Sequence, residues 1–571
     1  MSHVLTKAAA LGLTPMGPVP NARQLEWYGR ERMAFFHFGM NTYTDREWGD
    51  GSESPALFHP TELDCRGWIR AVKEAGFACA ILTAKHHDGF CLWPSAYTEH
   101  SVKNSPFRDG HGDVVREFTD ACREYDVKAG IYLSPWDRHE PTWGTDDYND
   151  FYVRQLTELL THYGDIHEVW WDGAGSTKCR YDWKRWADTV RTLQPNAVIF
   201  GSLGATPYVD VRWVGNERGI AGKPCFATID PSSLEIEIPF ELNRGKEDGS
   251  DFIPAEADVS IRPGWFYHAE QDAEVRTPEN LAELWFCSAG RNAGLLLNIP
   301  PNRQGLLCEK DVASLKGFDR LIADAFHDNL AKGARVSANS LRDPSCAPEK
   351  ILCDGGSDFY APADEAQATE LTFSFEQEVE FDCMTLSEVM ELGHRVFGLT
   401  LSAKVDGEWR PLCELSCVGN RCAERFDTVR TKEVKLSVTR TKGAPLLHSF
   451  GLYKLPPLSQ TDAYSMYIGK DLMASKAARL EQAGDTLELH LGGIRPFNLL
   501  RVKGDGIRKM EIEIFNGTDF EPKLVAEGAE YRFPRMIDWS YRLRVKVSGS
   551  IQGDLEAELF CDPSNQKNQK K

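Results

Sequence analysis

Two acidic residues, Asp172 and Glu217, stand where a pair of carboxyl groups could act together. Asp172 follows the short apolar run Val169–Trp171, and Gly173 then lets the backbone turn. Glu217 lies in the segment Gly215–Gly219, behind a second apolar run. Glycosidic bond hydrolysis requires one ionised and one protonated carboxyl group around a single sugar ring. The two acids therefore indicate chemistry on a neutral, hydroxyl-rich substrate.

Each acid also has a purely structural interpretation. An Asp at the end of an apolar strand often caps the following helix, and Glu217 could instead form an ion pair with Arg218 or Arg212. Further acids in the long polar segment stay open as alternatives to Glu217: Glu235, Glu237 and Glu241.

Imidazole and aromatic side chains follow similar apolar runs elsewhere in the first 300 residues. Flat aromatic faces can stack on the apolar side of a sugar ring, and His and Tyr can hydrogen-bond its hydroxyl groups. The side chains expected to meet at one mouth are His37, His86, His87, Tyr132, Trp170, Asp172 and Glu217.

Metal binding is the competing interpretation of these histidines together with Asp88. His86 and His87 are adjacent, so on a regular strand their side chains would point to opposite sides. The chain has no His-Glu-x-x-His or His-x-His spacing. We therefore expect sugar contact and no metal ion.

Alternating strand-like and helix-like segments are predicted from Arg32 to Leu330. Repeated strand–helix units over roughly 300 residues favour a closed (β/α)₈-like barrel, in which the C-terminal ends of the strands form the active site. No Gly-x-Gly-x-x-Gly turn follows the first strands, which disfavours a dinucleotide-binding sheet. The predicted strands cover residues 33–39, 78–84, 128–133, 168–172, 197–200, 209–214 and 294–300.

Beyond Arg335 the pattern changes to short, partly alternating strands separated by turn residues. Such spacing is typical of β-sandwiches, and Pro456-Pro457 marks a boundary between two of them. The expected class is α/β plus all-β. We expect a catalytic barrel over 1–334, β-sandwiches over 335–457 and 458–562, and a disordered tail over 563–571.

Composition limits the possible partners and the compartment. The net charge of −20 argues against nucleic acid and anionic membrane surfaces. No apolar run is long enough to span a membrane, and the N-terminal segment makes a poor signal peptide. The 15 cysteines are scattered without a Cys-x-x-Cys pair, which predicts free thiols and a cytoplasmic protein. Nothing in the sequence indicates the oligomeric state.

Several motifs, taken in order along residues 20–330, resemble those of the α-L-fucosidases of glycoside hydrolase family 29. The motifs are His37-Phe38-Gly39, Glu47-Trp48, His86-His87-Asp88-Gly89-Phe90, Tyr132-Leu133-Ser134, Trp170-Trp171-Asp172-Gly173 and Gly290-Arg291-Asn292 with Leu296-Leu297-Asn298. The resemblance implies a (β/α)₈-like barrel with a β-sandwich behind it. It also implies a retaining double displacement that uses no metal or organic cofactor.

The resemblance assigns roles to individual residues. The family's nucleophile falls on Asp172. Trp213–Gly219 and Pro263–His268 resemble the subgroup that cleaves α-1,3- and α-1,4-linked fucose from Lewis-type glycans, which implies Glu217 as the proton donor and Trp265 as a wall. The implied fucose contacts are His37, Glu47, Trp48, His86, His87, Tyr132 and Trp170.

The implied partner is a fucosylated oligosaccharide. Two alternatives stay open: a broader α-L-fucosidase acting on aryl and α-1,2 fucosides, and an inactive sugar-binding protein. Segments Phe381–Val405 and His448–Tyr453 faintly resemble discoidin-like carbohydrate-binding modules, although packing against the barrel explains them equally well.

Overall fold

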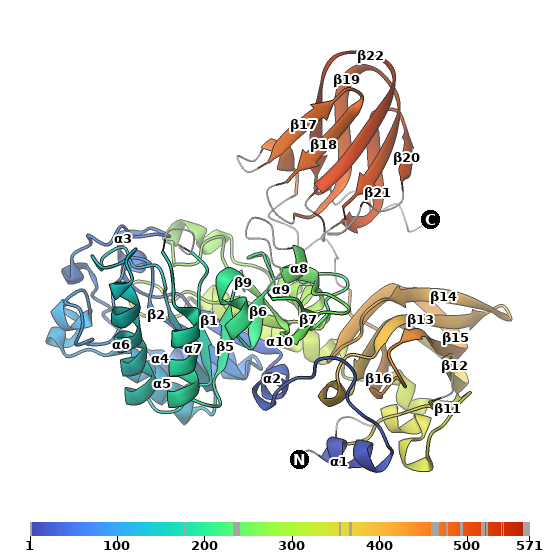
Figure 1. Cartoon of the computed structure of the whole chain (residues 1–571), viewed down its shortest axis with the longest axis horizontal. Helices are drawn as coiled ribbons and strands as arrows, with labels where there is room; N and C mark the ends of the chain where they lie inside the picture. The colour runs from blue at the N-terminus through green and yellow to red at the C-terminus, as the bar shows by residue number, and fades with distance from the viewer. Residues whose placement is uncertain are drawn as a thin grey trace.

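The computed structural model describes residues 3–174, 179–231, 240–352, 356–364, 368–457, 468–474, 478–491, 495–515, 520, 523–537, 540 and 542–562. In this part of the chain a closed parallel barrel is followed by two antiparallel sheets (Figure 1). The expected α/β plus all-β architecture is therefore confirmed.

Eight parallel strands close the barrel in the order β1-β10-β9-β6-β5-β4-β3-β2. Because all of them run the same way, their C-terminal ends meet at a single mouth. Their bounds are β1 Arg32–Phe36, β2 Cys79–Lys85, β3 Lys128–Leu133, β4 Glu168–Trp170, β5 Val198–Gly201, β6 Val211–Trp213, β9 Ala255–Ser260 and β10 Gly294–Asn298.

Strand β9 is the one barrel strand that the sequence did not predict. Glu256, Asp258 and Ser260 alternate along it with small apolar residues, and the whole strand is buried. Glu256 accepts a hydrogen bond from the indole of Trp170 and Asp258 accepts one from Trp213. Polar residues in a sequence usually indicate an exposed loop. Here the acidic side chains accept hydrogen bonds inside the barrel instead of from water, so the polar sequence was misleading.

Helices cover the outside of the barrel (Figure 1). Asp64, Asp113 and Asp182 each accept a backbone N–H of the first helical turn, which fixes where three of these helices begin. Helix α1 His3–Ala10 lies away from the barrel, beside the first antiparallel sheet (Figure 1). The other helices are α2 Ala22–Tyr28, α3 Met40–Thr44, α4 Cys65–Glu74, α5 Val114–Glu124, α6 Asp147–His162, α7 Trp183–Leu193, α8 Phe240–Arg244, α9 Pro278–Cys287 and α10 Glu309–Ala325. Two short strands, β7 Thr228–Ile229 and β8 Asp251–Phe252, pair antiparallel with each other outside the barrel sheet.

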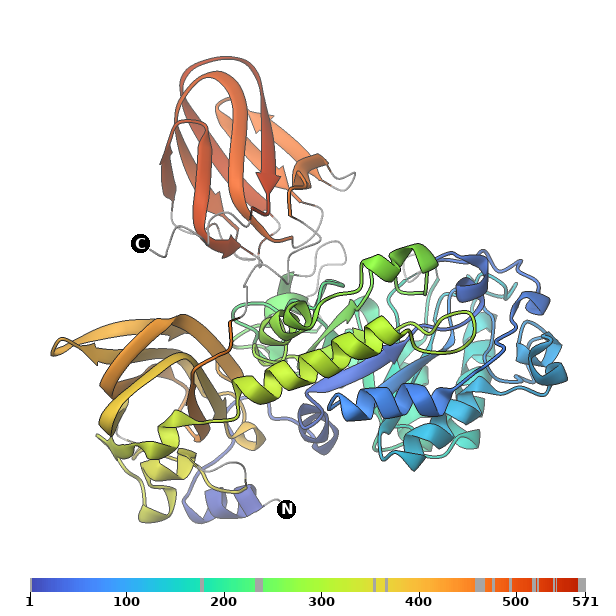
Figure 2. The ribbon, with the colours of Figure 1, turned by 180° about the vertical axis from the view of Figure 1, so that it is seen from behind.

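Helix α10 leads from the barrel toward the first antiparallel sheet, as Figure 2 shows. That sheet contains β11 Arg335–Ala338, β12 Thr369–Glu388, β13 Val396–Val405, β14 Glu408–Leu415, β15 Cys422–Thr441 and β16 Leu447–Tyr453. The second contains β17 Arg479–Ala483, β18 Thr486–His490, β19 Phe497–Ile514, β20 Leu524–Glu527, β21 Glu530–Ile537 and β22 Arg542–Phe560.

Each antiparallel sheet surrounds its own cluster of buried apolar side chains. Separate cores support the expected boundaries after residues 334 and 457, which we keep as a proposal. The expected tail over 563–571 lies outside the described residues.

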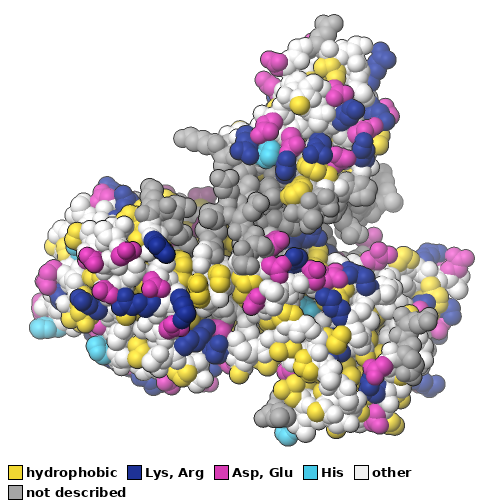
Figure 3. Space-filling model, viewed as in Figure 1, with side chains coloured by type: hydrophobic (Ala, Val, Ile, Leu, Met, Phe, Trp, Pro, Cys, Tyr) yellow, Lys and Arg dark blue, Asp and Glu magenta, His cyan; other side chains and the backbone are white. Residues whose placement is uncertain are grey.

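Acidic and basic side chains both occur over the barrel and the two sheets on the face seen in Figure 3. Among the described residues, the cysteines are free thiols, as predicted. In the same part of the chain, no helix combines the length and the apolar character needed to cross a bilayer.

Candidate active site

Asp172 lies two residues beyond the end of β4, at the mouth of the barrel. The hydroxyl of Tyr132 donates to its Oδ2 at 3.1 Å, and the backbone N–H of Ala174 donates to Oδ1 at 2.7 Å. The side chain is 29% exposed. Since Asp182 caps the following helix α7, Asp172 does not have the capping role that was its structural alternative.

The two tryptophans before Asp172 face opposite sides of the barrel wall, as strand alternation predicts. Trp170 points inward, stacks on Phe200 at 4.1 Å between ring centroids, and donates to Glu256 at 2.9 Å. Trp171 packs outward against Trp186 of α7. Trp170 therefore forms a fixed aromatic floor below Asp172.

His86 and His87 lie on the same side, contrary to the expectation that they would point apart. Their ring centroids are 4.0 Å apart, and His86 is stacked 5.8 Å from Tyr132. Nε2 of His87 is 3.8 Å from Oδ2 of Asp172. The expectation was wrong because β2 ends at Lys85, so the alternation rule no longer applies to these two residues.

Hydrogen bonds to Nδ1 fix the tautomer of His37. The carboxamide nitrogen of Asn298 donates to the carbonyl of Trp265, which can only accept, so Oδ1 of Asn298 must be the atom facing His37. Nδ1 of His37 therefore carries a proton and donates to Oδ1 at 2.9 Å. Nε2 is left as an acceptor. Burial lowers the pKa of His37 to about 3, so the ring is neutral near pH 7.

The same reasoning assigns the other two imidazoles. Asn41 donates through Nδ2 to the carbonyl of Glu47 and to Nδ1 of His86, so the proton of His86 is on Nε2. Ser134 donates to the carbonyl of Trp136 and accepts from Nδ1 of His87, which leaves Nε2 of His87 as an acceptor. Burial lowers both histidine pKa values. The mouth thus holds three neutral imidazoles with defined donor and acceptor atoms.

Glu217 follows β6 and is an exposed residue, but the protein atoms around its carboxyl group still remove part of its hydration. The indole Nε1 of Trp265 donates to its Oε2 at 3.3 Å. Desolvation and the negative charge of Asp172 raise the pKa of Glu217, which favours its protonated form. Arg212, one of the ion-pair alternatives for Glu217, donates instead to the backbone carbonyls of Leu242 and Phe226. Of the alternative acids, Glu235 and Glu237 lie outside the described residues, and Glu241 is in the short helix α8.

Glu47 and Trp48 come from the segment after α3 and approach the mouth from another side. Glu47 accepts the backbone N–H groups of Trp265, at 2.8 Å, and of Phe266, at 3.2 Å. Trp48 is 59% exposed, with its ring edge-on to His87 at 6.1 Å. The indole of Trp265 lies 5.0 Å from the ring of His37. The structure thus brings all ten residues singled out in the sequence to one region.

Two further acids, Glu256 and Asp258, lie below the mouth and were not predicted from the sequence. Burial, together with the charges of Glu217 and Asp172, raises the pKa of Asp258, and burial raises the pKa of Glu256 to about 7. Both residues lie on β9. The strict alternation Ala-Glu-Ala-Asp-Val-Ser was a period-two signal that could have revealed the strand.

Potential metal ligands gather away from the three mouth histidines. Among the residues that the structure describes, the ligand atoms of Asp45, His268 and Glu270 lie within 4.8 Å of one another. None of these three residues was expected from the sequence to face the substrate.

Comparisons with known proteins agree with the geometry. Residues 16–323 match the model of a family described as alpha-L-fucosidase. Alpha-L-fucosidase 1 of Arabidopsis thaliana is 41% identical over 451 residues, covering 77% of this chain and 88% of that protein. The crystal structure of a putative alpha-L-fucosidase from Bacteroides thetaiotaomicron has 46% identity and a TM-score of 0.76, covering 78% of this chain and 99% of that one. A Ruminococcus gnavus family 29 fucosidase in complex with fucose has 31% identity and a TM-score of 0.72, covering 79% and 97%.

Gly264 provides a test of the position of Glu47. A Cβ atom at this glycine would lie 2.4 Å from Oε1 of Glu47, so Gly264→Ala must displace the carboxylate. We expect kcat/KM on 4-nitrophenyl α-L-fucoside to fall about ten- to hundredfold, since one hydrogen bond to a charged group contributes about 1.5–3 kcal/mol. Gly333→Ala is the matched control, because nothing lies within 4 Å of its added Cβ. Equal activity of the two variants would contradict the importance of this geometry.

Proposed function

Because this chain belongs to the α-L-fucosidase family of glycoside hydrolases, we propose that it releases terminal α-1,3- or α-1,4-linked fucose from branched oligosaccharides with retention of configuration. The observation that carries the proposal is that Asp172 and Glu217 follow β4 and β6 at the same mouth, each with a hydrogen-bond donor from Tyr132 or Trp265. Desolvation and the charge of Asp172 raise the pKa of Glu217 there. A retaining glycosidase needs one charged and one protonated carboxyl group at the start of its cycle.

Asp172 acts as the nucleophile in this proposal. Its carboxylate attacks the anomeric carbon of fucose, the bond to the leaving oxygen breaks, and a covalent fucosyl-enzyme forms. The hydrogen bonds from Tyr132 and Ala174 hold the carboxylate in one orientation. Such positioning lowers the entropic barrier to attack.

Glu217 acts first as the acid and then as the base. Its proton passes to the leaving glycan oxygen as the glycosidic bond breaks. The resulting carboxylate then takes a proton from a water molecule, which attacks the anomeric carbon and releases Asp172. Formation of the fucosyl ester removes the charge of Asp172, which lowers the pKa of Glu217 and suits it to the second role.

The neutral groups around the acids suit a neutral sugar. With the assigned tautomers, Nε2 of His37 and of His87 can accept hydrogen bonds from fucose hydroxyls, and Nε2–H of His86 can donate one. Trp265 offers an aromatic face to the apolar parts of the ring, including the methyl group of fucose, and Trp170, stacked on Phe200 and on Tyr132, closes the bottom of the site. We propose that these residues, with Glu47, Trp48 and Tyr132, bind fucose, the sugar held by the Ruminococcus gnavus relative.

The linkage preference rests on the segments Trp213–Gly219 and Pro263–His268, which resemble the α-1,3/1,4 subgroup. The hydrogen bond between Trp265 and Glu217 joins these two segments at the mouth. A broader enzyme acting on aryl and α-1,2 fucosides is the second candidate, because the exposed Trp48 and Glu217 leave this side of the mouth open.

Asp172→Asn tests the nucleophile. Turnover of 4-nitrophenyl α-L-fucoside is expected to fall by several orders of magnitude while the thermal unfolding midpoint stays close to that of the native protein. Azide should restore part of the activity and give β-L-fucosyl azide, which has the inverted configuration. Native-like turnover of this variant would remove Asp172 from the mechanism.

Glu217→Gln tests the acid through pH dependence. Loss of the proton from Glu217 should lower the native kcat/KM as pH rises above its raised pKa, so the native profile has an alkaline limb. The Gln variant should lose that limb with an oligosaccharide, and its kcat/KM should stay near the native value with α-L-fucosyl fluoride, whose leaving group needs no proton. On an oligosaccharide its rate should fall about 10²–10⁴-fold. An unchanged alkaline limb would assign the acid to another residue.

Product analysis on defined glycans tests the linkage. We expect fucose release from Lewis trisaccharides to exceed release from an α-1,2-fucosylated disaccharide or from 4-nitrophenyl α-L-fucoside at equal concentration. Comparable kcat/KM values on all three substrates would favour the broader enzyme instead.

A further inference from the structure

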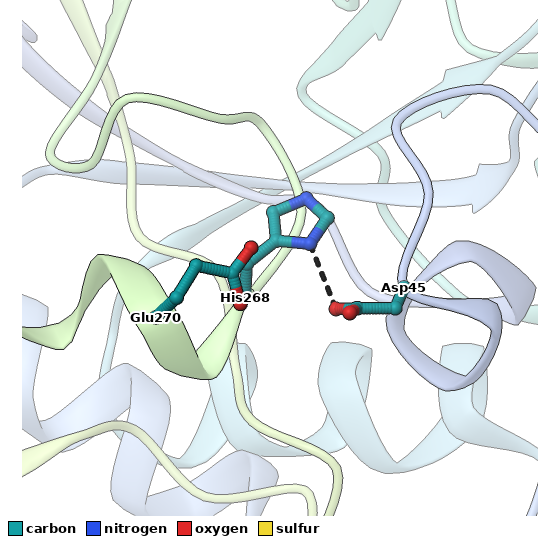
Figure 4. A group of neighbouring side chains, drawn as sticks. All are labelled: Asp45, His268 and Glu270. Carbon is teal, nitrogen blue, oxygen red and sulfur yellow. Dashed lines mark hydrogen bonds and ion pairs between the residues drawn. The ribbon is translucent and has the colours of Figure 1, made fainter.

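His268 lies between two carboxylates beside the proposed fucose site. Nδ1 of its ring is 2.9 Å from Oδ1 of Asp45, and Nε2 is 2.6 Å from Oε1 of Glu47. Figure 4 shows the ring turned with Nδ1 toward Asp45 and with Glu270 on the neighbouring turn. The side chain of His268 is buried, whereas Asp45 is half exposed. The imidazole thus connects an outer acid to an acid of the active site.

These distances favour a doubly protonated imidazole. Each ring nitrogen faces a carboxylate oxygen, which can only accept, so both nitrogens are required as donors. Burial by itself lowers the pKa of His268, but hydrogen bonds and attraction from Glu47 and Asp45 outweigh it and raise the pKa. Glu270 adds a further negative charge nearby, and the guanidinium of Arg303 lies 3.7 Å from Asp45.

A bound cation is the competing use of Asp45, His268 and Glu270. The separation of 2.9 Å between Nδ1 and Asp45 is a normal hydrogen-bond length, and Arg303 already supplies positive charge to the same oxygen of Asp45. A metal ion would have to compete with both. The geometry therefore points to an imidazolium rather than to a metal site.

The hydrogen bond between His268 and Glu47 connects His268 to the proposed catalytic groups. Oε1 of Glu47 accepts from His268 and from the backbone of Phe266, and Oε2 accepts from the backbone of Trp265. The indole of Trp265 in turn donates to Glu217. The carboxylate of Glu47 therefore fixes the loop that carries Trp265, and Trp265 in turn contacts the proposed acid, Glu217.

We propose that His268 is a positioning residue, which donates from one ring nitrogen to Asp45 and from the other to Glu47 and so fixes the orientation of Glu47 for fucose binding. This inference rests on the proposed role of Glu47. Nothing in the proposal requires His268 to touch the substrate.

A double-mutant cycle tests the proposal. His268→Gln is expected to lower kcat/KM on α-L-fucosyl fluoride about ten- to hundredfold, chiefly through KM, as for the loss of one hydrogen bond to a charged group. In a Glu47→Gln background the same change should cost less than about threefold, because coupled residues are non-additive. His327→Gln is the matched control, since His327 also pairs with a carboxylate, Asp328, but at an exposed site. Its activity should equal that of the native enzyme.

Two results of the cycle would overturn the proposal: native-like activity of His268→Gln, or losses that simply multiply in the double variant. α-L-Fucosyl fluoride is used because it needs no proton from Glu217, so a defect there reports on binding rather than on acid catalysis. Equal thermal unfolding midpoints for the single variants and the native protein show that folding is not the cause of any loss.

Nitrogen NMR of the imidazole groups supplies a measurement that does not depend on turnover. The signal absent from His268→Gln should show an imidazolium at pH 7 in the native protein, and in Glu47→Gln it should titrate at lower pH. A neutral ring at pH 7 would contradict the proposal, as would activity that EDTA abolishes and Zn²⁺ restores. Failure of the native protein to release fucose would instead contradict the proposed function, so the two failures can be distinguished.

Discussion

The active site depends on a buried ionic network inside the barrel. Arg30 donates to Glu168 at 2.6 Å, and Glu168 lies against Glu256, which accepts from the indoles of Trp170 and Trp27. Burial and mutual repulsion raise the pKa of Glu168, and burial raises that of Glu256, so this pair retains a proton beside the single charge of Arg30. Buried charges persist only when they are paired and hydrogen-bonded. The network is thereby constrained to one arrangement, and it fixes the plane of Trp170 under the proposed fucose site.

The same constraint explains how one mouth can contain several acids. Asp172 is partly exposed, and its carboxylate receives two hydrogen bonds. Glu217 and Asp258 lie within reach of that charge, and both have raised pKa values. Like charges in a poorly solvated space cannot all ionise, so the charge concentrates where a hydrogen-bond donor supports it. The division of roles between the two proposed catalytic acids follows from their surroundings.

Most of the barrel could be predicted because the residues that define each helix or strand are neighbours in the sequence. The helices that follow Asp64, Asp113 and Asp182 combine a cap with helical spacing, and the seven predicted strands are mostly apolar. Strand β9 was missed because its acids are stabilised by Trp170 and Trp213, which are distant in the sequence. A local pattern cannot reveal partners of this kind.

The candidate site shows the same limit at the level of single side chains. The residue types expected at the mouth follow from strand ends, but the tautomers of His37 and His86 depend on Asn298 and Asn41, which no spacing rule connects to them. The predicted directions of His86 and His87 were also wrong, because β2 ends at Lys85, before both residues. The side a side chain faces can therefore be predicted while the strand is regular. Beyond the end of the strand, the direction of a side chain cannot be predicted from alternation.

The histidines near the mouth differ in charge because their surroundings differ. The three in the mouth are neutral because burial acts on them without a carboxylate at hydrogen-bonding distance, and His268 is charged because it has two. A neutral imidazole loses little hydration energy when a sugar covers it, whereas an ion loses far more. Placing the imidazolium behind Glu47 keeps its charge out of the substrate's path while its effect on Glu47 remains. The mouth can then receive an uncharged ligand while charge stays with the proposed catalytic acids.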